Sequence, residues 1–339
     1  MSISKSIARK FIFPFLHKLG YNQNLIRNNA DKVLIVAYHG VLPNPDLSIN
    51  YRHISLKEFK AHLDFYKQNF EVLSVEQIVN KEFKSNKPKL VITFDDAYKN
   101  IFKYAMPLLQ EYGFYSSVYV VTNSLSVPHY LLWPDYIDIL KKHKTPQIQF
   151  GTYTFTLKNN SYWAQNEEIE IVSYIKSLGV ERDVYFENLK QQIIDLLGEK
   201  VFDDEYYRLI NVDELRKYQQ EFPLVIWGSH TTNHYNLGNI ASDLVIEQLQ
   251  LSKQILENDL KTKVNEIAYP DGSYTDFVYE NGKIYPFQMA VKYNDSSIDT
   301  SKKGLFNRKM ISTSTTIEAN YFHIAQALKK EGIALDKFN

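Results

Sequence analysis

The sequence predicts an α/β fold in which helices cover a parallel sheet, either open or closed into a barrel. Two observations indicate this class. Short apolar segments rich in β-branched and aromatic residues recur along the chain, and helical patterns lie between several of them. Such continuously apolar strands are typical of a sheet buried on both faces. The length of 339 residues and the hydrophobic content of 44% suit one large α/β barrel with an insertion.

Six segments are predicted to be buried strands, because each is short and apolar. They are Val33–Tyr38, Leu90–Phe94, Ser117–Val121, Leu224–Trp227, Glu266–Tyr269 and Met289–Lys292. Helices are predicted between several of them. Residues 55–68 place apolar side chains on one stripe, and residues 98–112 are helical with a break expected at Pro107. A third helix should occupy residues 242–260, with Ser242 as its N-cap.

The chain is predicted to have three parts. Residues 1–30 form an N-terminal helical segment, and residues 31–124 and 221–339 form the barrel. Residues 125–220 interrupt the strand–helix rhythm with a turn at Trp133–Asp135, a polar β-like stretch and charged helical stretches. We interpret this block as an insertion that could cap the barrel mouth. A passive structural excursion is the alternative.

The N-terminal segment combines positive charge with apolar side chains. Its basic residues are Lys5, Arg9, Lys10, Lys18 and Arg27. The apolar run at 11–16 is too short to span a bilayer, and we expect no signal peptide. A basic amphipathic helix on a membrane or on the barrel is one interpretation, and a helix that simply packs on the domain is the other. We expect a cytoplasmic protein, with a peripheral membrane position as an alternative.

Charge and cysteine content exclude several classes of protein. The 39 basic residues balance 39 acidic residues, which argues against a dedicated nucleic-acid-binding protein. The chain has no cysteine. Disulfides and cysteine-ligated zinc are therefore excluded, and any transition metal must be bound by histidine and carboxylate.

Chemically active residues follow four of the predicted strands. The motifs are Tyr38-His39-Gly40, Thr93-Phe94-Asp95-Asp96, Ser229-His230-x-x-x-His234 and Tyr269-Pro270-Asp271-Gly272. The carboxyl ends of parallel strands converge on one face of an α/β fold, so these groups are expected at one rim. Packing alone explains such a grouping poorly, and a functional site is predicted there.

The histidine pair and the acidic pair are candidate metal ligands. His230 and His234 lie four positions apart, as two imidazoles on one helical turn would to share a metal, or they are surface or capping histidines. Asp95 and Asp96 end an apolar strand, where two charges are costly to desolvate without a cation, or they cap the following helix. One carboxylate and two imidazoles would leave positions open for water and substrate.

In this order the motifs resemble those of the polysaccharide deacetylases (NodB-homology, carbohydrate esterase family 4). The acidic, double-histidine and Tyr-Pro-Asp-Gly motifs look like the first, second and third motifs of that family. The resemblance covers about residues 33–124 and 222–312. It implies a distorted (β/α) barrel of the NodB-homology type, with a large insertion between the first and second metal motifs.

The resemblance also implies roles. Asp95 would be the general base, and Asp96, His230 and His234 would bind one divalent metal ion, for which this ligand set favours zinc. Such an ion acidifies a bound water and polarises the acetyl carbonyl, and the base takes the water's proton. The third motif, Tyr269, Pro270, Asp271 and Gly272, would bind substrate, with the N–H after the proline helping to hold the oxyanion.

The chain departs from the family pattern at the third motif. Ala268 stands near the place of the usual arginine, and Asp271 replaces an aromatic residue. Arg308 could supply the missing guanidinium from elsewhere, or it is an ordinary surface arginine. No good Leu-x-His motif follows, and the only downstream histidine is His323, in a terminal helical pattern.

A circularly permuted subset of the family, the poly-N-acetylglucosamine deacetylases, resembles the chain more closely. That subset has a Tyr-His motif on an N-terminal strand and lacks the usual third-motif arginine. Its N-terminal histidine is the acid, and His39 matches it. The resemblance therefore implies that His39 protonates the leaving amine. The alternative is a strand-end histidine whose ring bonds a backbone carbonyl.

The sequence thus predicts a metal-dependent hydrolase that removes N-acetyl groups from a glycan or glycan precursor. Its expected partner is an N-acetylated saccharide. Two alternatives stay open: an O-acetyl esterase or small-amide hydrolase on the same fold, and a catalytically inactive glycan-binding scaffold. The intact aspartate and histidine motifs speak against the scaffold, whereas Ala268 and Asp271 keep it open.

Overall fold

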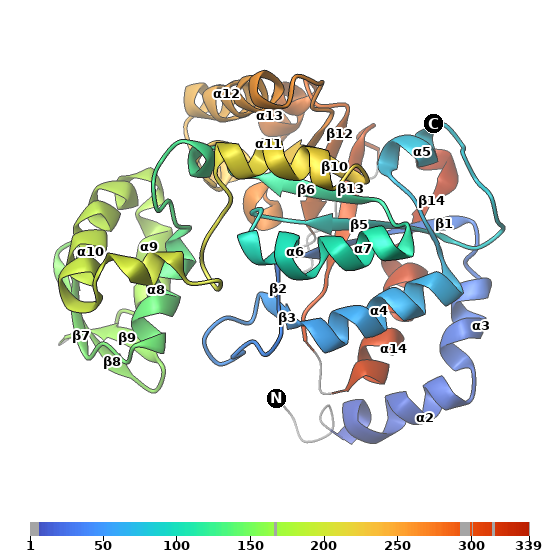
Figure 1. Ribbon diagram of the computed structural model, residues 1–339, viewed down its shortest axis with the longest axis horizontal. Coiled ribbons are helices and arrows are strands. Elements are labelled where there is room, and N and C mark those ends of the chain that lie inside the picture. Colours follow the sequence, from blue (N-terminus) through green and yellow to red (C-terminus); the bar gives the residue numbers. More distant parts are fainter. Residues whose placement is uncertain (1–6, 166–167, 292–298, 300, 314–315, 339) are drawn as a thin grey trace.

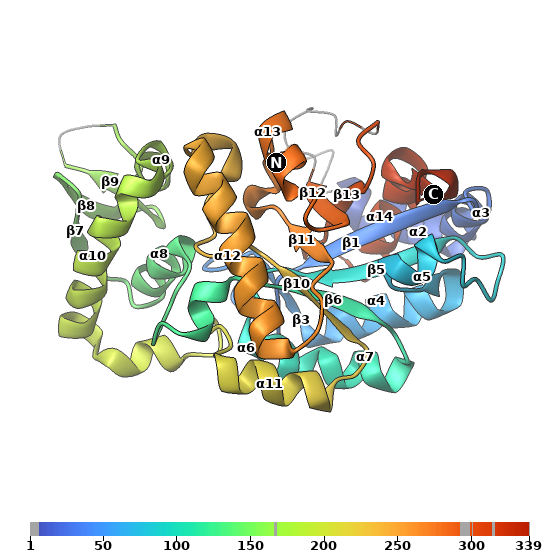
Figure 2. The same ribbon diagram turned by 90° about the horizontal axis from the view of Figure 1, so that it is seen from above.

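Seven parallel strands close into a barrel (Figure 2), as the computed structural model shows. It describes residues 7–165, 168–291, 299, 301–313 and 316–338. The barrel strands are β1 (Lys32–Tyr38), β5 (Lys89–Phe94), β6 (Ser116–Val120), β10 (Val225–Ser229), β11 (Glu266–Ala268), β12 (Phe287–Val291) and β13 (Leu305–Met310). Around the barrel the order is β1-β13-β12-β11-β10-β6-β5, and β5 pairs back onto β1. The predicted distorted (β/α) barrel is confirmed.

Neighbouring strands of the barrel differ in how many residues they pair. Strand β1 pairs with β5 over six residues, whereas β10 and β11 share only the pair Ser229 and Ile267. The six predicted strands are present, with shifts of one or two residues at their described ends. Lys292, the predicted end of the sixth strand, lies outside the described residues.

The prediction missed the seventh strand, β13. Its sequence, Leu-Phe-Asn-Arg-Lys-Met, interrupts the apolar pattern with three polar residues. One of them, Arg308, is buried inside the barrel, where its guanidinium bonds Asp95 and lies over the Tyr119 ring. A search for apolar continuity cannot find such a strand.

Short strands and helices complete the barrel domain. The strands are β2 (Gly40–Leu42), β3 (His53–Ser55), β4 (Glu71–Val72) and β14 (Ile333–Ala334). The helices are α4 (Leu56–Asn69), α5 (Val75–Val79), α6 (Lys99–Tyr104), α7 (Met106–Tyr112), α11 (Val212–Glu221), α12 (Ser242–Leu260), α13 (Asp276–Gly282) and α14 (Ile317–Glu331). Short 3-10 turns lie at η2 (Thr122–Leu125), η3 (Gly179–Glu181), η4 (Glu199–Asp203), η5 (Leu237–Asn239), η6 (Pro270–Gly272) and η7 (Leu335–Phe338).

Two predicted helix details change. The break expected at Pro107 falls at Ala105, because Pro107 lies in the first turn of α7, where its missing N–H costs nothing. The predicted N-cap Ser242 is wrong, since Ala241 occupies that position and Ser242 is the first helical residue.

The N-terminal segment is helical and packs on the barrel domain beside α14 (Figure 1). It comprises the π-helical turn η1 (Ala8–Ile12), α2 (Phe13–Lys18) and α3 (Tyr21–Arg27). The Phe13 ring stacks on Phe322 of α14 with 4.0 Å between ring centroids. Residues 1–6 of this segment, including Lys5, lie outside the described residues. In the described part of the chain, no helix has both the length and the apolarity needed to cross a bilayer.

Most of residues 125–220 form a separate lobe beside the barrel mouth, at the left of both Figure 1 and Figure 2, whereas α11 lies with the barrel. It contains α8 (Trp133–Lys142), α9 (Ile171–Ser177), α10 (Arg182–Leu197) and an antiparallel sheet of β7 (Gln147–Phe150), β8 (Tyr153–Lys158) and β9 (Ser161–Ala164). The lobe has its own cluster of buried apolar residues. The turn predicted at Trp133–Asp135 is wrong, because these residues form the first turn of α8, with Pro134 near its start.

Candidate metal and catalytic site

The predicted site residues meet at the carboxyl ends of the barrel strands. A cavity of about 450 Å³ lies there between the barrel rim and the lobe. From the barrel it is lined by His39, Asp95, Asp96, His230, His234 and Arg308, and from the lobe by Trp133, Pro134, Asp138 and Lys176 among others. Strands β1, β5, β10 and β13 therefore bring the polar residues at their carboxyl ends to one cavity.

Three of these residues converge as metal ligands do. Asp96 Oδ1 lies 3.5 Å from His230 Nε2 and 3.4 Å from His234 Nε2. Two ligand atoms bound at about 2.0–2.1 Å to one tetrahedral ion lie about 3.3–3.4 Å apart. Asp96 Oδ1 is buried and has no hydrogen-bond partner among the described residues. The donor atoms of these three residues thus fit a single divalent ion.

A backbone contact sets the tautomer of His230. Its Nδ1 lies 2.7 Å from the carbonyl oxygen of Ala268. A carbonyl can only accept, so Nδ1 carries the proton and the lone pair of Nε2 faces Asp96 and His234. Ala268, which replaces the arginine expected by resemblance, therefore contributes its backbone to orient a candidate ligand.

The two histidines do not share a helical turn, and that part of the prediction is wrong. They lie in the loop after β10, in which Thr231 and His234 have φ angles of 67° and 56°. The backbone N–H of Thr231 bonds the Ser229 hydroxyl at 3.0 Å, and that of His234 bonds the Thr231 hydroxyl at 3.2 Å. Positive φ is costly for non-glycine residues, so this loop holds strain at the site.

Asp95 is paired with Arg308. The guanidinium donates from Nη1 to Oδ1 at 2.6 Å and from Nη2 to Oδ2 at 2.9 Å. Burial alone would raise the pKa of Asp95, but the Arg308 charge outweighs it and holds this pKa well below its ordinary value. Arg308 is 1% exposed, so the alternative of an ordinary surface arginine is wrong.

Asp96 shows the opposite shift from its neighbour. Burial and the adjacent Asp95 carboxylate raise the pKa of Asp96 well above its ordinary value. A carboxylate in such a place is stable in its charged form only when a cation compensates it. The two adjacent aspartates therefore sit in different electrostatic surroundings, one beside a guanidinium and the other beside two imidazoles.

His39 lines the same cavity, directly after β1. Burial lowers its pKa to about 4, against the opposing charge of Asp95, so the ring is neutral near pH 7 in the free protein. No hydrogen bond of the His39 ring to a backbone carbonyl is seen within the described residues. His323, by contrast, lies in α14, packs against Phe13 of α2 and does not line this cavity.

The four residues of the third motif differ in how far they are exposed to the cavity. Tyr269 and Pro270 are buried in the barrel domain, and the Tyr269 hydroxyl donates to Gln288. Asp271, with a φ of 55°, is exposed toward the cavity. Gly272 has a φ of 65°, and a Cβ there would lie 2.6 Å from atoms of Val291, which requires glycine.

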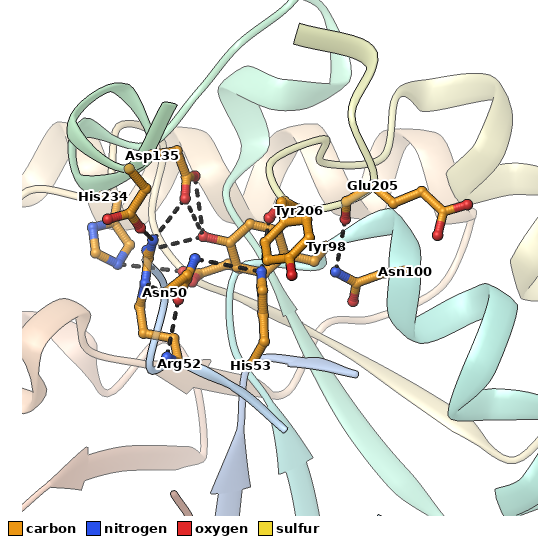
Figure 3. A network of polar contacts seen from close by, with 11 residues as sticks. Asn50, Arg52, His53, Tyr98, Asn100, Asp135, Glu205, Tyr206 and His234 are labelled. Atoms are coloured by element: carbon orange, nitrogen blue, oxygen red, sulfur yellow. Dashed lines mark hydrogen bonds and ion pairs between the residues drawn. The ribbon is translucent and has the colours of Figure 1, made fainter. Parts of the chain in front are cut away.

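A polar network that the sequence reasoning missed joins the lobe to the barrel beside this site (Figure 3). Arg52 Nη2 donates to Asp135 Oδ1 at 2.7 Å and to Asp138 Oδ2 at 2.8 Å, and its Nη1 donates to the Tyr98 hydroxyl at 3.0 Å. The Tyr98 hydroxyl also contacts both oxygens of Asp135 at 3.0 Å. The only sign of this network in the sequence was a pair of acidic residues three positions apart, Asp135 and Asp138. Their partner, Arg52, lies 83 positions before Asp135.

Fold and site together define a (β/α) barrel with a candidate metal centre at the carboxyl ends of its strands. The family model described as polysaccharide deacetylase matches residues 83–290, more than half of the chain. The chain therefore belongs to the polysaccharide deacetylase family, and the predicted family is confirmed. The match runs through the lobe, which the motif resemblance had left outside. The closer resemblance to the permuted subset stays a prediction.

Individual relatives are distant. YxkH of Bacillus subtilis (strain 168), a candidate polysaccharide deacetylase, is 27% identical over 104 residues, which are 30% of this chain and 36% of that protein. The match thus spans about a third of this relative's length. The Streptococcus pyogenes deacetylase PplD, solved with acetate, gives a TM-score of 0.53 at 16% identity, covering 87% of this chain and 98% of that one. A de-N-acetylase from Aggregatibacter actinomycetemcomitans gives 0.53 at 14% identity, covering 86% and 99%. These structural likenesses show a shared fold.

Proposed function

We propose that this protein is a metal-dependent hydrolase that removes N-acetyl groups from a glycan or glycan precursor. One observation carries the proposal. Asp96, His230 and His234 converge on one point beside the paired Asp95, at the rim of a barrel of this family. A fold neighbour named as a de-N-acetylase supports the choice of an amide rather than an ester.

The residues divide the work as follows. A divalent ion held by Asp96, His230 and His234 would activate a water and polarise the acetyl carbonyl. Asp95, kept ionised by Arg308, accepts the proton of the attacking water. The backbone N–H of Asp271 helps to hold the oxyanion. We favour zinc, because two imidazoles and one carboxylate form a typical catalytic zinc set.

The leaving amine needs a proton, and two groups could deliver it. Asp95 could return the proton that it took from water. His39 lines the same cavity and is our proposed acid, although burial keeps it neutral in the free protein near pH 7. Its role as acid therefore requires that bound substrate raise its pKa.

The lobe is proposed to cap the site. Trp133, Asp138 and Lys176 line the cavity opposite the candidate ligands, and Arg52 ties α8 to the barrel. A cap on one side of the cavity limits the access of water and strengthens electrostatic interactions inside it. The predicted insertion, residues 125–220, would then supply the cap, apart from α11 at its end, which packs with the barrel formed by residues 31–124 and 221–339.

Acetate release tests the proposal. The purified protein is incubated with N-acetylglucosamine oligomers and with O-acetylated saccharides, with and without a chelator. We expect acetate from the N-acetylated sugars, lost with chelator and restored by added metal. Release from O-acetylated sugars alone would favour the esterase alternative. Metal binding without turnover of any substrate would favour the inactive glycan-binding scaffold.

A further inference from the structure

The N-terminal helix, residues 8–18 in η1 and α2, is packed on one face only. On the packed face the Phe13 ring stacks on Phe322, and the His17 ring lies 5.0 Å from that of Tyr321. These contacts fix the helix against α14, which lies beside α2 in Figure 1. Because this packing fixes the helix, its opposite face always points toward solvent.

The opposite face carries a stripe of large apolar side chains. The stripe consists of Ile7, Phe11, Ile12, Phe15 and Leu19, which are 50%, 62%, 49%, 60% and 64% exposed. Four of these five recur every fourth residue, as on one side of a helix. Single exposed apolar side chains are ordinary on protein surfaces, but a contiguous stripe is typical of a contact with a membrane or another macromolecule.

Charge indicates which of these partners fits. The first 30 residues contain five basic residues and no acidic residue, although basic and acidic residues balance at 39 each in the whole chain. The Lys10 ammonium lies 5.6 Å from the centre of the exposed Phe11 ring, so positive charge lies next to the stripe. A second copy of the chain would bring like charges together, whereas anionic lipid headgroups would attract them.

The helix also begins close to the candidate active site. Arg9 lines a small cavity together with Met310, Ile311 and Ser312, and those three residues also line the active-site cavity. The Thr316 hydroxyl donates to the backbone carbonyl of Arg9 at 3.3 Å. A surface that contacts the helix would therefore lie near the β13 side of the cavity.

We propose that this helix binds the surface of an anionic lipid bilayer, with the stripe inserted among the lipids and the exposed Lys10 and Lys18 at the headgroups. An apolar face bordered by lysine and arginine is the pattern of interfacial helices. The barrel domain then holds the helix in place, so the exposed face is available to a bilayer without rearrangement.

Vesicle co-sedimentation of the full chain tests this proposal. One set of vesicles is phosphatidylcholine with phosphatidylglycerol, and the other is phosphatidylcholine alone. We expect binding to the anionic vesicles that weakens as salt rises. Replacing both aromatic side chains (Phe11→Ser with Phe15→Ser) should weaken it about tenfold or more. Removing two of the five positive charges (Lys10→Gln with Lys18→Gln) should weaken the preference for anionic vesicles.

A matched control is Val184→Ser in α10, which removes an apolar side chain that is 71% exposed elsewhere. It should bind as the wild type does. Wild-type protein that stays in the supernatant with both vesicle types overturns the proposal, as does unchanged binding of the double aromatic variant. A dimer that this variant converts to a monomer, without vesicle binding, would identify a second copy as the occupant. Acetate release from soluble saccharides is measured separately, so the proposed function is tested independently of membrane binding.

Discussion

Arg308 and Asp95 form a buried bidentate ion pair although they lie 213 positions apart in the chain, with N–O distances of 2.6 and 2.9 Å. Both oxygens of the proposed base are thereby oriented by a rigid guanidinium. The resemblance expected an arginine at the third motif, on β11, where the chain has Ala268. The guanidinium next to the acidic motif comes instead from β13, two strands further around the barrel.

The first prediction concerns this arginine as a positioning residue. Arg308→Met keeps side-chain volume but leaves Asp95 buried without a counter-charge. We expect acetate release to fall about 100-fold, because the base is no longer aimed, and the free energy of unfolding to fall by about 3–5 kcal/mol. Arg308→Lys should recover part of the stability and less of kcat, since one ammonium cannot bind both oxygens. Wild-type kcat in a folded Arg308→Met protein contradicts the positioning role.

The second prediction concerns metal content. His230→Ala and His234→Ala each remove one of three converging donor atoms, so both variants should lose most of a bound divalent ion. Elemental analysis after dialysis measures this loss. His323→Ala is the matched control, since that histidine packs in α14 away from the cavity. Stoichiometric metal in a variant lacking both loop histidines contradicts the assignment.

The third prediction separates the paired carboxylates. Asp95 faces Arg308, and Asp96 faces the two imidazoles. Asp95→Asn should therefore retain the metal and lose turnover, by about 10²–10⁴-fold for a missing base. Asp96→Asn should weaken metal binding itself. Titration with metal and kinetics under metal saturation distinguish the two effects. The reverse pattern would exchange the two roles.

Much of the candidate site was predictable because its residues follow apolar strands directly. Asp96 and His230 could be placed at one rim from strand order alone, since parallel strands end on the same face. Arg308 was named as a possible source of the guanidinium, but its place at the rim could not be predicted, because its strand is polar and its partner directly follows β5, on the other side of β1. The Arg52 network was also beyond reach, since contacts between distant loops and the lobe depend on tertiary packing. The prediction that His230 and His234 share a helical turn was wrong, because a spacing of four residues does not by itself specify a helix.

The fourth prediction uses the Arg52 network. Asp138 shares the Arg52 guanidinium with Asp135, and Lys141 and Tyr207 also lie in its surroundings. Burial raises the pKa of Asp138 to about 7, with Arg52 opposing the rise and Asp135 adding to it. Its unfolded pKa is about 3.9. Between these values the folded state holds a proton that the unfolded state has lost, so this stabilisation is present at low pH and lost as pH rises through about 7.

We therefore expect the free energy of unfolding of wild type, relative to Asp138→Asn, to fall by about 1–3 kcal/mol between about pH 5 and about pH 8. Urea unfolding at both pH values measures it. Asp195→Asn, at an exposed position of α10, is the control and should show no such difference. An Asp138→Asn variant with the same pH dependence as wild type would contradict the raised pKa.

The fifth prediction concerns His39. Amide cleavage needs a proton on the departing nitrogen, because an amide anion is a very poor leaving group. If His39 supplies it, His39→Ala should lower kcat by about 10²–10⁴-fold and leave metal content unchanged. The alkaline limb of the kcat profile should flatten, since the acid must be protonated in the complex while the base is ionised. In the free protein the pKa of His39 is about 4, so the His39-dependent break in the kcat/KM profile should fall near pH 4 and not near neutral pH.

Comparison of two substrates completes the His39 test. An ester leaving group needs less protonation than an amine, so turnover of an O-acetylated sugar should suffer less than turnover of an N-acetylated one. Equal losses on both would indicate that His39 shapes the cavity rather than donating a proton. His39→Gln retains a side chain of similar size, and we expect it to behave as His39→Ala does, because an amide cannot replace the acid. Wild-type amide turnover by either folded variant would leave Asp95 as the group that returns the proton.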